Sequence, residues 1–362
     1  MTTSVITLQS VCNYGTQLQA YATQKKLEQY FGYIEFVNYA RPDTYGRGLR
    51  QAYAKGNPLR WLIFLPTNFK WKRVFGNFQK NNLNITHQSY RKTQDFLDYP
   101  IQADVYFSGS DQVWNTGWNN GIIPQLYLSY APDDKPKYAF SSSFGQSSLT
   151  PQDIPEVKKY LQRYKRISVR EETGEKIIRE QIGLQNVIRL NDPTLSFDGD
   201  FWREIKTKNK IHHPYILIYN LNNNPDFDQY ALEITKRTSY KLYRFCTRYD
   251  QVRKCGKSLI IPKIEDFITY IDDAKIVITD SFHAAAFSAN LNTKVIILPP
   301  KKYSSRIRDF QKLIHDEGSI AKSYHDYSPL KHSADYKHIN DILHQERTKI
   351  DIFLEQIKKE IK

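Results

Sequence analysis

The residues from 274 to 299 constrain the fold more than any other stretch, because they predict one compact β-α-β unit. An apolar, β-branched run ends at Thr279, an alanine-rich segment follows, and a second apolar run closes at Pro299. β-branched runs favour strands and alanine favours helices, so each change of composition marks a change of element. Small side chains in the helix let it lie close to a sheet. We therefore expect an α/β fold.

The polar corner of this unit, from Asp280 to His283, is the first candidate site. Asp280 or Ser281 can cap the helix, which places His283 in its first turn. Backbone N–H groups and the helix dipole favour an anion at that position. A histidine there has two protonation states within reach of neutral pH. The alternative is a capped helix with one polar histidine at its start.

Length and cysteine content limit the class of protein. A chain of 362 residues suits two α/β domains, each with its own core. Cys12, Cys246 and Cys255 are too few and too far from other ligands to indicate a zinc site or a disulfide framework. The sequence shows neither a signal peptide nor an apolar run of about 18 residues. We expect a soluble, cytoplasmic protein without a metal.

The net charge of +14 is concentrated in an insertion at about 41–100. Between Arg41 and Lys92 there are eleven basic residues and one acid, Asp43, interleaved with bulky apolar side chains such as Trp71. This mixture suits an anionic membrane surface or an amphiphile that carries a phosphate. Nucleic acid is the rival partner, and an ordinary solvated insertion is the third interpretation.

Polar loops follow two predicted strands of the first half. Asn13 lies at the start of a helix after the first strand, where a loop can hold an anion or a hydroxyl. The strand at 103–107 opens into a polar loop in which Asp111 can bind sugar hydroxyls and Trp114 can stack on a pyranose. The alternative is a tight turn with a packed tryptophan.

Arg170, and either Arg306 or Arg308, are further candidate anion ligands. Arg170 directly follows the strand at 167–169 and can bind a carboxylate or phosphate with its planar fork. The neighbouring Glu171 can instead form an ion pair without a catalytic purpose. Arg306 or Arg308 follows a basic loop that leaves the second sheet at the edge of His283, so either can complete an anion site.

The alternation of strands and helices restarts in the second half of the chain, at Tyr215. We therefore predict an N-terminal domain over 1–205, which includes the insertion, and a C-terminal domain over 206–338. The charged, amphipathic residues 339–362 predict a final helix that can pack across both domains.

Five short motifs occur in an order that resembles the polysaccharide pyruvyltransferase family. They are Asn13–Gln19, Gly109–Asn115, Ser168–Glu171, Asp192–Thr194 and Thr279–His283. Together they span nearly the whole chain, apart from the basic insertion and the C-terminal tail. The family commonly has a glycine after the histidine, where this chain has Ala284. The approach of a ligand to the backbone can differ for that reason.

The resemblance implies a GT-B-like fold, in which two Rossmann-like domains face one another across a cleft. It implies transfer of a pyruvyl group from phosphoenolpyruvate to two sugar hydroxyls, giving a cyclic ketal. The acceptor would be a bacterial capsule, exopolysaccharide or lipid-linked precursor at the inner face of the cell membrane. Phosphoenolpyruvate would be the co-substrate, with no cofactor, metal or nucleic-acid partner.

Site roles can be assigned on this basis. His283 and Arg170 would be catalytic, with His283 as general acid and then base. Arg170, Ser281, His283 and Arg306 would bind the donor, and Asn13, Asp111 and Trp114 would bind the acceptor. Two alternatives stay open: a GT-B glycosyltransferase that uses a nucleotide sugar, and a non-catalytic glycan-binding protein of a polysaccharide assembly complex.

Overall fold

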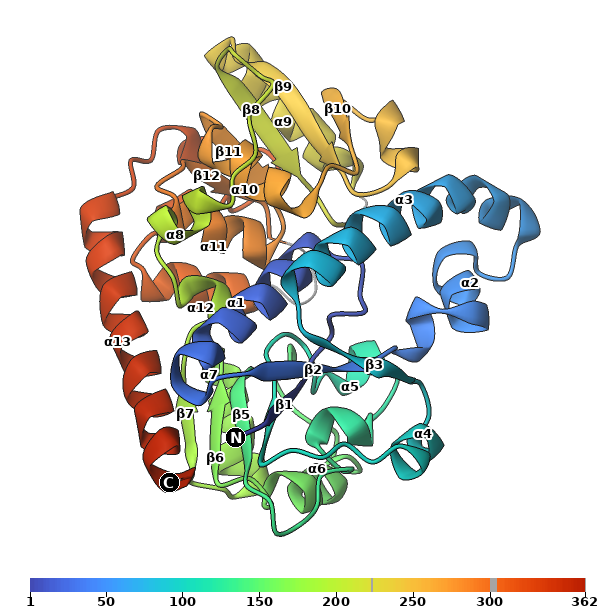
Figure 1. Ribbon diagram of the computed structural model, residues 1–362. Helices are drawn as coiled ribbons and strands as arrows, with labels where there is room; N and C mark the ends of the chain where they lie inside the picture. The colour runs from blue at the N-terminus through green and yellow to red at the C-terminus, as the bar shows by residue number, and fades with distance from the viewer. Residues whose placement is uncertain (223, 300–304, 362) are drawn as a thin grey trace. The chain divides into compact units, whose positions relative to one another are not determined.

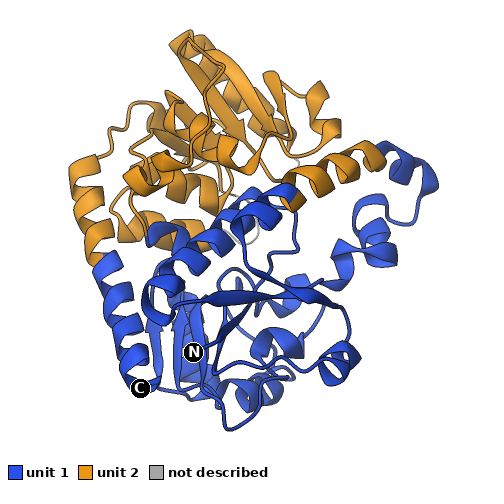
Figure 2. Ribbon diagram, viewed as in Figure 1, with its two compact units in different colours: residues 1–63, 77–196, 346–362 blue, residues 64–76, 197–345 orange. Residues whose placement is uncertain are grey.

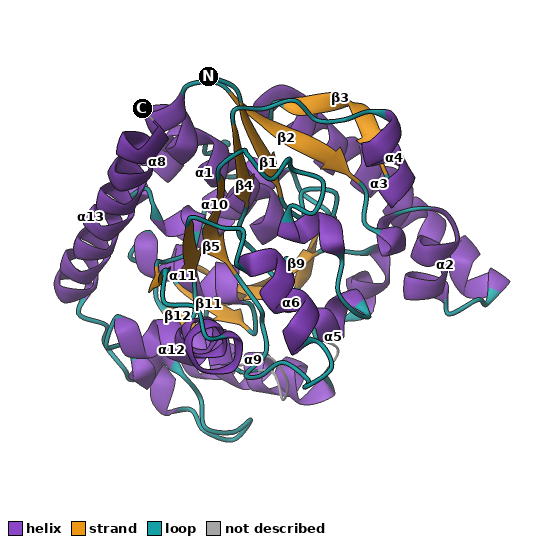
Figure 3. Ribbon diagram, turned by 90° about the horizontal axis from the view of Figure 1, so that it is seen from below, coloured by secondary structure: helices purple, strands orange, loops and turns teal. Residues whose placement is uncertain are grey.

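The computed structural model describes residues 1–222, 224–299 and 305–361, which form two compact units (Figure 2). Unit 1 comprises residues 1–63, 77–196 and 346–362, and unit 2 comprises residues 64–76 and 197–345. In each unit a parallel sheet forms the central layer, with helices along its faces (Figure 3). This is the α/β architecture that the sequence predicts.

The sheet of unit 1 has seven parallel strands in the order β3-β2-β1-β4-β5-β6-β7 (Figure 1). Their bounds are β1 (Thr3–Ile6), β2 (Ile34–Tyr39), β3 (Ile85–Tyr90), β4 (Val105–Ser108), β5 (Lys137–Ser142), β6 (Arg166–Val169) and β7 (Val187–Arg189). β1 pairs with both β2 and β4, so the strand order reverses there. Ligands of open α/β sheets bind at the carboxyl ends of strands beside such a reversal.

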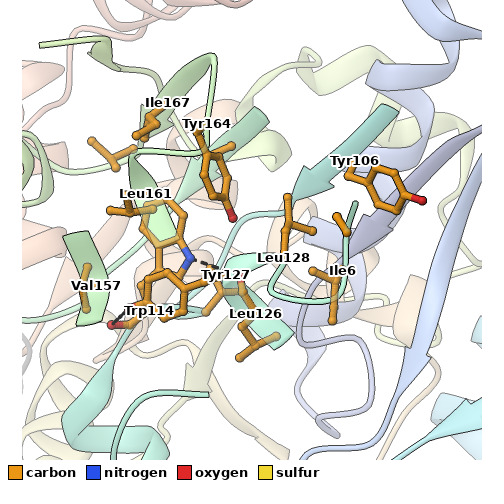
Figure 4. Close-up of a cluster of buried hydrophobic side chains, with 14 of the residues drawn as sticks. Ile6, Tyr106, Trp114, Leu126, Tyr127, Leu128, Val157, Leu161, Tyr164 and Ile167 are labelled. Atoms are coloured by element: carbon orange, nitrogen blue, oxygen red, sulfur yellow. Dashed lines mark hydrogen bonds between the residues drawn. The ribbon is translucent and has the colours of Figure 1, made fainter. Parts of the chain in front are cut away.

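The helices of unit 1 lie mostly on the two faces of this sheet (Figure 1). They include α1 (Tyr14–Phe31), α2 (Gly46–Ala54), α4 (Thr93–Asp98), α5 (Thr116–Asn119), α6 (Ile154–Leu161) and α7 (Glu172–Lys176), while α3 (Pro58–Asn82) and α13 (Tyr336–Ile361) contribute part of their length. One core cluster joins α1 and α13 to the sheet through Leu27, Phe107 and Phe353. The other cluster contains Trp114 and Tyr164 (Figure 4).

The sheet of unit 2 has five parallel strands in the order β10-β9-β8-β11-β12. Its strands are β8 (Tyr215–Tyr219), β9 (Lys241–Cys246), β10 (Lys257–Ile260), β11 (Ile276–Thr279) and β12 (Val295–Ile297). Its helices include α8 (Gly199–Glu204), α9 (Pro225–Thr238), α10 (Ile264–Asp272), α11 (Phe282–Asn290) and α12 (Ser305–Leu313). The order reverses between β8 and β11, so the corner after β11 lies at the reversal.

The boundaries of the units differ from the predicted domains. The main segment of unit 2 begins at Phe197 rather than 206, and Arg203 of α8 forms an ion pair with Asp272 of the same unit at 3.0 Å. Residues 64–76 also belong to unit 2, since the Trp71 indole Nε1 donates a hydrogen bond to the Thr247 carbonyl at 2.7 Å. The end of α13 belongs to unit 1.

The predicted insertion at 41–100 is only partly an insertion. Its first part forms α2 and the whole of α3, but residues 85–90 form β3, the edge strand of the first sheet. Among the described residues, no helix combines the length and the apolar character needed to cross a membrane.

Candidate active site

The corner after β11 has the local structure that the sequence predicts. β11, α11 and β12 form the β-α-β unit, and Ser281 rather than Asp280 caps α11. The Ser281 hydroxyl accepts a hydrogen bond from the Ala284 backbone N–H at 3.5 Å. His283 is buried in the first turn of α11, at the carboxyl edge of the sheet. The side chains of Ala284 to Ser288 are also buried, which lets α11 pack closely.

Asp280 fixes this corner to the loop after β8. Its carboxylate accepts hydrogen bonds from the Asn220 side chain and the Leu221 backbone N–H, both at 2.8 Å, and from the Asn222 backbone and side chain, both at 2.9 Å. Burial raises the pKa of Asp280, and the hydrogen bonds act in the opposite direction. Sequence reasoning considered Asp280 only as a helix cap and missed this link between two loops.

Arg306 lies at the same sheet edge as His283. Its guanidinium carbon is 5.9 Å from the centre of the Phe282 ring, and that ring is 5.4 Å from the ring of His283, centre to centre. Arg306 is half-buried, whereas Arg308 on the next part of α12 is exposed. The basic loop predicted before Arg306 falls on residues 300–304, outside the described residues. The structure therefore places Ser281, His283 and Arg306 around Phe282, at one edge of the sheet of unit 2.

Unit 1 contains a buried network of charges around Arg170. The guanidinium donates to Asp192 and to Asp111, the latter at 3.1 Å, and its Nε lies 3.8 Å from the Glu171 carboxylate. Burial acts to lower the pKa of Arg170, but the charges of Asp192, Asp111 and Glu171 outweigh it and raise the pKa. The prediction that Arg170 binds an anionic donor stays a prediction. Its contacts give it another role, which is to hold three carboxylates together.

Each carboxylate of this network also binds a loop. The Glu171 carboxylate accepts from the Ser143 hydroxyl at 2.6 Å and from the Gly145 backbone N–H at 3.0 Å. Asp192 accepts from the backbone N–H and the hydroxyl of Thr194, at 3.0 and 2.8 Å. The network thus joins the loops that follow β5, β6 and β7. The sequence singled out Asp192 and Thr194 by resemblance but gave them no role.

Asp111 connects this network to the start of α1. Its carboxylate accepts a hydrogen bond from the Thr16 hydroxyl at 2.7 Å and from the Gln112 backbone N–H at 2.9 Å. Asn13 caps α1 by accepting from the Thr16 backbone N–H at 3.3 Å, and it is half-buried. Unit 1 therefore brings Asn13, Asp111 and Arg170 together through Thr16, which lies in the Asn13–Gln19 motif but had been given no role. Their roles toward a ligand stay predictions.

The prediction that Trp114 stacks on a sugar is wrong. Its indole is completely buried in the core of unit 1 and stacks on Tyr127, with ring centres 5.4 Å apart (Figure 4). The indole N–H donates to the Leu126 carbonyl at 3.2 Å. Polar neighbours in the sequence indicated an exposed loop. The burial of Trp114 comes from Tyr127 and Tyr164, which are distant along the chain.

Metal ligation has no candidate cluster in the part of the chain that the structure describes. Within residues 1–222, 224–299 and 305–361, no group of three or more His, Cys, Asp or Glu side chains is arranged to hold a metal ion. Asp111, Asp192 and Glu171 of unit 1 instead form ion pairs with the guanidinium of Arg170.

Comparison with known proteins gives one family and one fold. A family profile described as polysaccharide pyruvyl transferase matches residues 13–302. No curated protein matches the sequence. Among solved structures, UDP-N-acetylglucosamine 2-epimerase from Rickettsia bellii has a TM-score of 0.53 at 10% identity, covering 99% of this chain and 97% of that one.

Two further structures share the fold. UDP-GlcNAc 2-epimerase from Methanocaldococcus jannaschii has a TM-score of 0.52 at 11% identity, with 91% of each chain covered. Os79 from O. sativa, in complex with UDP and deoxynivalenol-3-glucoside, has a TM-score of 0.53 at 8% identity, with 100% of both chains covered. At such identities the likeness shows the fold alone, and it confirms the predicted GT-B-like pair of Rossmann-like domains.

Proposed function

The chain belongs to the polysaccharide pyruvyl transferase family, and from this premise we propose that it transfers a pyruvyl group from phosphoenolpyruvate to two hydroxyls of a sugar. The product is a cyclic pyruvate ketal on a bacterial surface polysaccharide, such as a capsule or exopolysaccharide, or on its lipid-linked precursor. The observation that carries the proposal is the position of His283, in the first turn of α11 at the carboxyl edge of β11.

The reaction needs proton transfers in both directions. One proton is added to the methylene carbon of phosphoenolpyruvate, and the first hydroxyl oxygen bonds to the adjacent carbon. The bond from that carbon to the phosphate oxygen breaks, and the second hydroxyl oxygen closes the ring. Of the two protons that the hydroxyls lose, one balances the proton given to the methylene carbon and the other leaves with inorganic phosphate.

His283 suits these transfers because histidine can give and accept a proton near neutral pH. We assign it the donation to the methylene carbon and the later removal of a hydroxyl proton. The donor carries a carboxylate and a phosphate, so its site needs cations or helix-end N–H groups. The N-terminus of α11, capped by Ser281, and the guanidinium of Arg306 beside Phe282 supply both kinds of group.

The acceptor residues in this proposal are Asn13 and Asp111. Asn13 is half-buried at the start of α1, and Asp111 follows β4 beside the reversal of strand order in unit 1. Arg170 holds Asp111, Asp192 and Glu171 in place. In this proposal Arg170 therefore affects the acceptor indirectly, by positioning the loops that those carboxylates bind.

Turnover tests the proposal. The protein is incubated with phosphoenolpyruvate and a panel of bacterial glycans and lipid-linked oligosaccharides. Release of phosphate and the mass of the product are measured together. We expect phosphate release that depends on a glycan and yields a ketal. His283→Ala should lower the rate by about 100-fold or more, as expected for loss of a general acid, while His325→Ala, an exposed histidine of unit 2, should keep it.

Three outcomes would contradict the proposal. One is full activity of His283→Ala, which would remove that residue from the mechanism. Another is release of a nucleoside diphosphate from a nucleotide sugar, which would make the protein a glycosyltransferase of the same fold. The third is glycan binding without any phosphate release, which would indicate a non-catalytic glycan-binding protein.

A further inference from the structure

Only some of the apolar side chains of helix α3 lie on its buried, inward face. The buried positions recur every three or four residues, as expected for one side of a helix: Phe64, Thr67, Trp71, Phe75 and Phe78. Trp71 hydrogen-bonds the Thr247 carbonyl, and the Thr67 hydroxyl accepts from the Tyr249 backbone N–H at 3.1 Å. These contacts fix which side of α3 points outward.

The outward side of α3 carries four large apolar side chains. Leu59, Leu62, Ile63 and Phe69 are 64%, 60%, 61% and 70% exposed. A helix turns once in 3.6 residues, so these positions fall on one side, with Pro66 between them. Single exposed apolar residues are ordinary on a protein surface, but a group of this size on one helix face indicates an interaction surface.

Helix α3 and the preceding helix α2 are strongly basic. From Gly46 to Asn82 the chain has no acidic residue and eight basic ones: Arg47, Arg50, Lys55, Arg60, Lys70, Lys72, Arg73 and Lys80. All of these except the half-buried Lys70 are exposed. Arg73 lies one turn after Phe69 on the outward side of α3, and a turn at Lys55–Asn57 joins α2 to α3 (Figure 1). The apolar side of α3 is therefore continuous with exposed positive charge.

We propose that the outward face of α3, together with the basic residues of α2, binds the surface of an anionic lipid bilayer. The helix would lie in the plane of the interface, with Leu59, Leu62, Ile63 and Phe69 among the upper acyl chains. The lysines and arginines would meet the negative headgroups. Helices whose exposed face combines apolar side chains with basic neighbours bind membranes in this way.

The chemistry favours a bilayer over two other occupants. Nucleic acid is bound by basic grooves with aromatic platforms for the bases, whereas three of the four exposed apolar side chains are aliphatic. A second copy of this chain would place the same positive charges opposite each other across a two-fold axis. A bilayer alone offers both an apolar depth and a negative surface.

This inference goes beyond the proposed transfer reaction, because lipid binding needs no phosphoenolpyruvate. Lipid binding and pyruvyl transfer are linked only through the location of the acceptor. A protein held at the inner face of the membrane is placed where lipid-linked acceptors occur, so membrane attachment would matter for such an acceptor and not for a water-soluble glycan.

Vesicle sedimentation with the full chain tests the inference. The vesicles contain phosphatidylcholine alone or phosphatidylcholine with phosphatidylglycerol. We expect sedimentation only with the phosphatidylglycerol vesicles and a loss of binding at high salt. Leu62→Gln with Phe69→Gln should weaken binding by about tenfold or more, and Lys72→Glu with Arg73→Glu should weaken it by roughly fivefold or more for each charge removed.

Matched controls lie elsewhere on unit 1 and unit 2. Leu97→Gln removes an apolar side chain of α4 that is 67% exposed, next to Asp98, and Lys337→Glu reverses an exposed charge on α13. Both variants should bind vesicles as the native chain does. Turnover of a water-soluble acceptor should be unchanged in every one of these variants, so failure of lipid binding and failure of the transfer reaction are distinguishable.

Four results would overturn the inference. They are no binding to phosphatidylglycerol vesicles, equal binding by the α3 variants and the native chain, tighter binding to a DNA or RNA oligonucleotide than to vesicles, and self-association that Leu62→Gln with Phe69→Gln abolishes. The last result would assign the face to a second copy of the chain.

Discussion

At the scale of single residues, buried charges around Arg170 hold the loops of unit 1 together. Arg170 forms ion pairs with Asp111, Asp192 and Glu171. Removing it would take this shared cation away from three buried carboxylates. The penalty for an uncompensated buried charge exceeds that for a lost surface pair, so this arginine should matter for folding as well as for activity.

We predict that Arg170→Ala lowers the free energy of unfolding by about 3–5 kcal/mol, the range for breaking a buried ion pair. Arg170→Lys should cost less, because it keeps the charge and loses the planar fork. Urea unfolding measures both. Arg179→Ala is the matched control, since this partly exposed arginine pairs with Glu175 on the same helical segment and should change stability by less than about 1 kcal/mol. Equal effects of the two alanine variants would contradict the prediction.

The raised pKa of Asp280 should make the free energy of unfolding depend on pH. Burial raises its pKa above the ordinary value of 3.8, so the folded protein holds that proton more tightly than the unfolded chain does. The stability that Asp280 contributes is then fully present below pH 3.8 and is lost as the pH rises through the raised pKa. The free energy of unfolding of the native chain minus that of Asp280→Asn should therefore fall as the pH rises from 3.8.

Asp326 provides a control of opposite sign. Hydrogen bonds, first from the Lys322 backbone N–H and then from Ser328, lower its pKa from 3.8. Its contribution is present above pH 3.8 and is lost as the pH falls through the lowered value. Urea unfolding at a series of pH values measures both differences. A slope of the same sign for Asp280→Asn and Asp326→Asn would show that the assignment of Asp280 is wrong.

Local patterns predicted some residues well and others poorly, for physical reasons. The helix cap was predictable to within two residues, Asp280 or Ser281, because a cap at the start of an alanine-rich helix is determined by neighbours in the sequence, and the structure selects Ser281. Trp114 was not, because its burial depends on Tyr127 and Tyr164. The carboxylate contacts of Arg170 were likewise hidden, since Asp111 and Asp192 are far from it along the chain.

At the scale of elements, strands and helices with clear local signals were predictable. The unit of β11, α11 and β12 was identified from composition alone, and α13 begins three residues before its predicted start. β3 was missed, because Ile85–Tyr90 is a partly exposed edge strand within a basic stretch. An edge strand buries less apolar surface, so it leaves a weaker pattern in the sequence.

The loop after β5 gives a prediction at this scale. Gly145 has a φ of +61°, and an added Cβ would lie 2.3 Å from Gln112 Oε1 and 2.7 Å from Asn115 Nδ2. Gly145→Ala should therefore strain the backbone and disturb the hydrogen bond from the Gly145 N–H to Glu171. We expect a loss of about 1–3 kcal/mol in the free energy of unfolding, the cost of a strained backbone residue.

Gly76→Ala is the control for this loop. Gly76 lies inside α3 with nothing within 4 Å of an added Cβ. Alanine there should raise stability by about 0.5–1 kcal/mol, because glycine destabilises a helix interior. Thermal or urea unfolding of the two variants compares them directly. A Gly145→Ala variant as stable as Gly76→Ala would contradict the strain inferred from the loop geometry.

At the scale of the whole molecule, the sequence predicted two α/β domains and the family fold but not which segments compose each unit. The alternation of strands and helices is a local signal, so it revealed two sheets. The assignment of residues 64–76 to unit 2 and of 346–362 to unit 1 depends on contacts between distant segments. Buried side chains such as Phe353 and Leu354 make the end of α13 part of the core of unit 1.

Phosphoenolpyruvate is the donor in the proposed reaction, and thermal unfolding of the protein with added ligands tests this proposal. A ligand at about 100 times its Kd stabilises the folded state by about 2.7 kcal/mol if it does not bind the unfolded chain. We predict a higher Tm with phosphoenolpyruvate, a smaller rise in Arg306→Ala, and an unchanged rise in Arg308→Ala, which alters the exposed neighbour on α12. No rise with phosphoenolpyruvate, together with a clear rise with a nucleotide sugar, would contradict it.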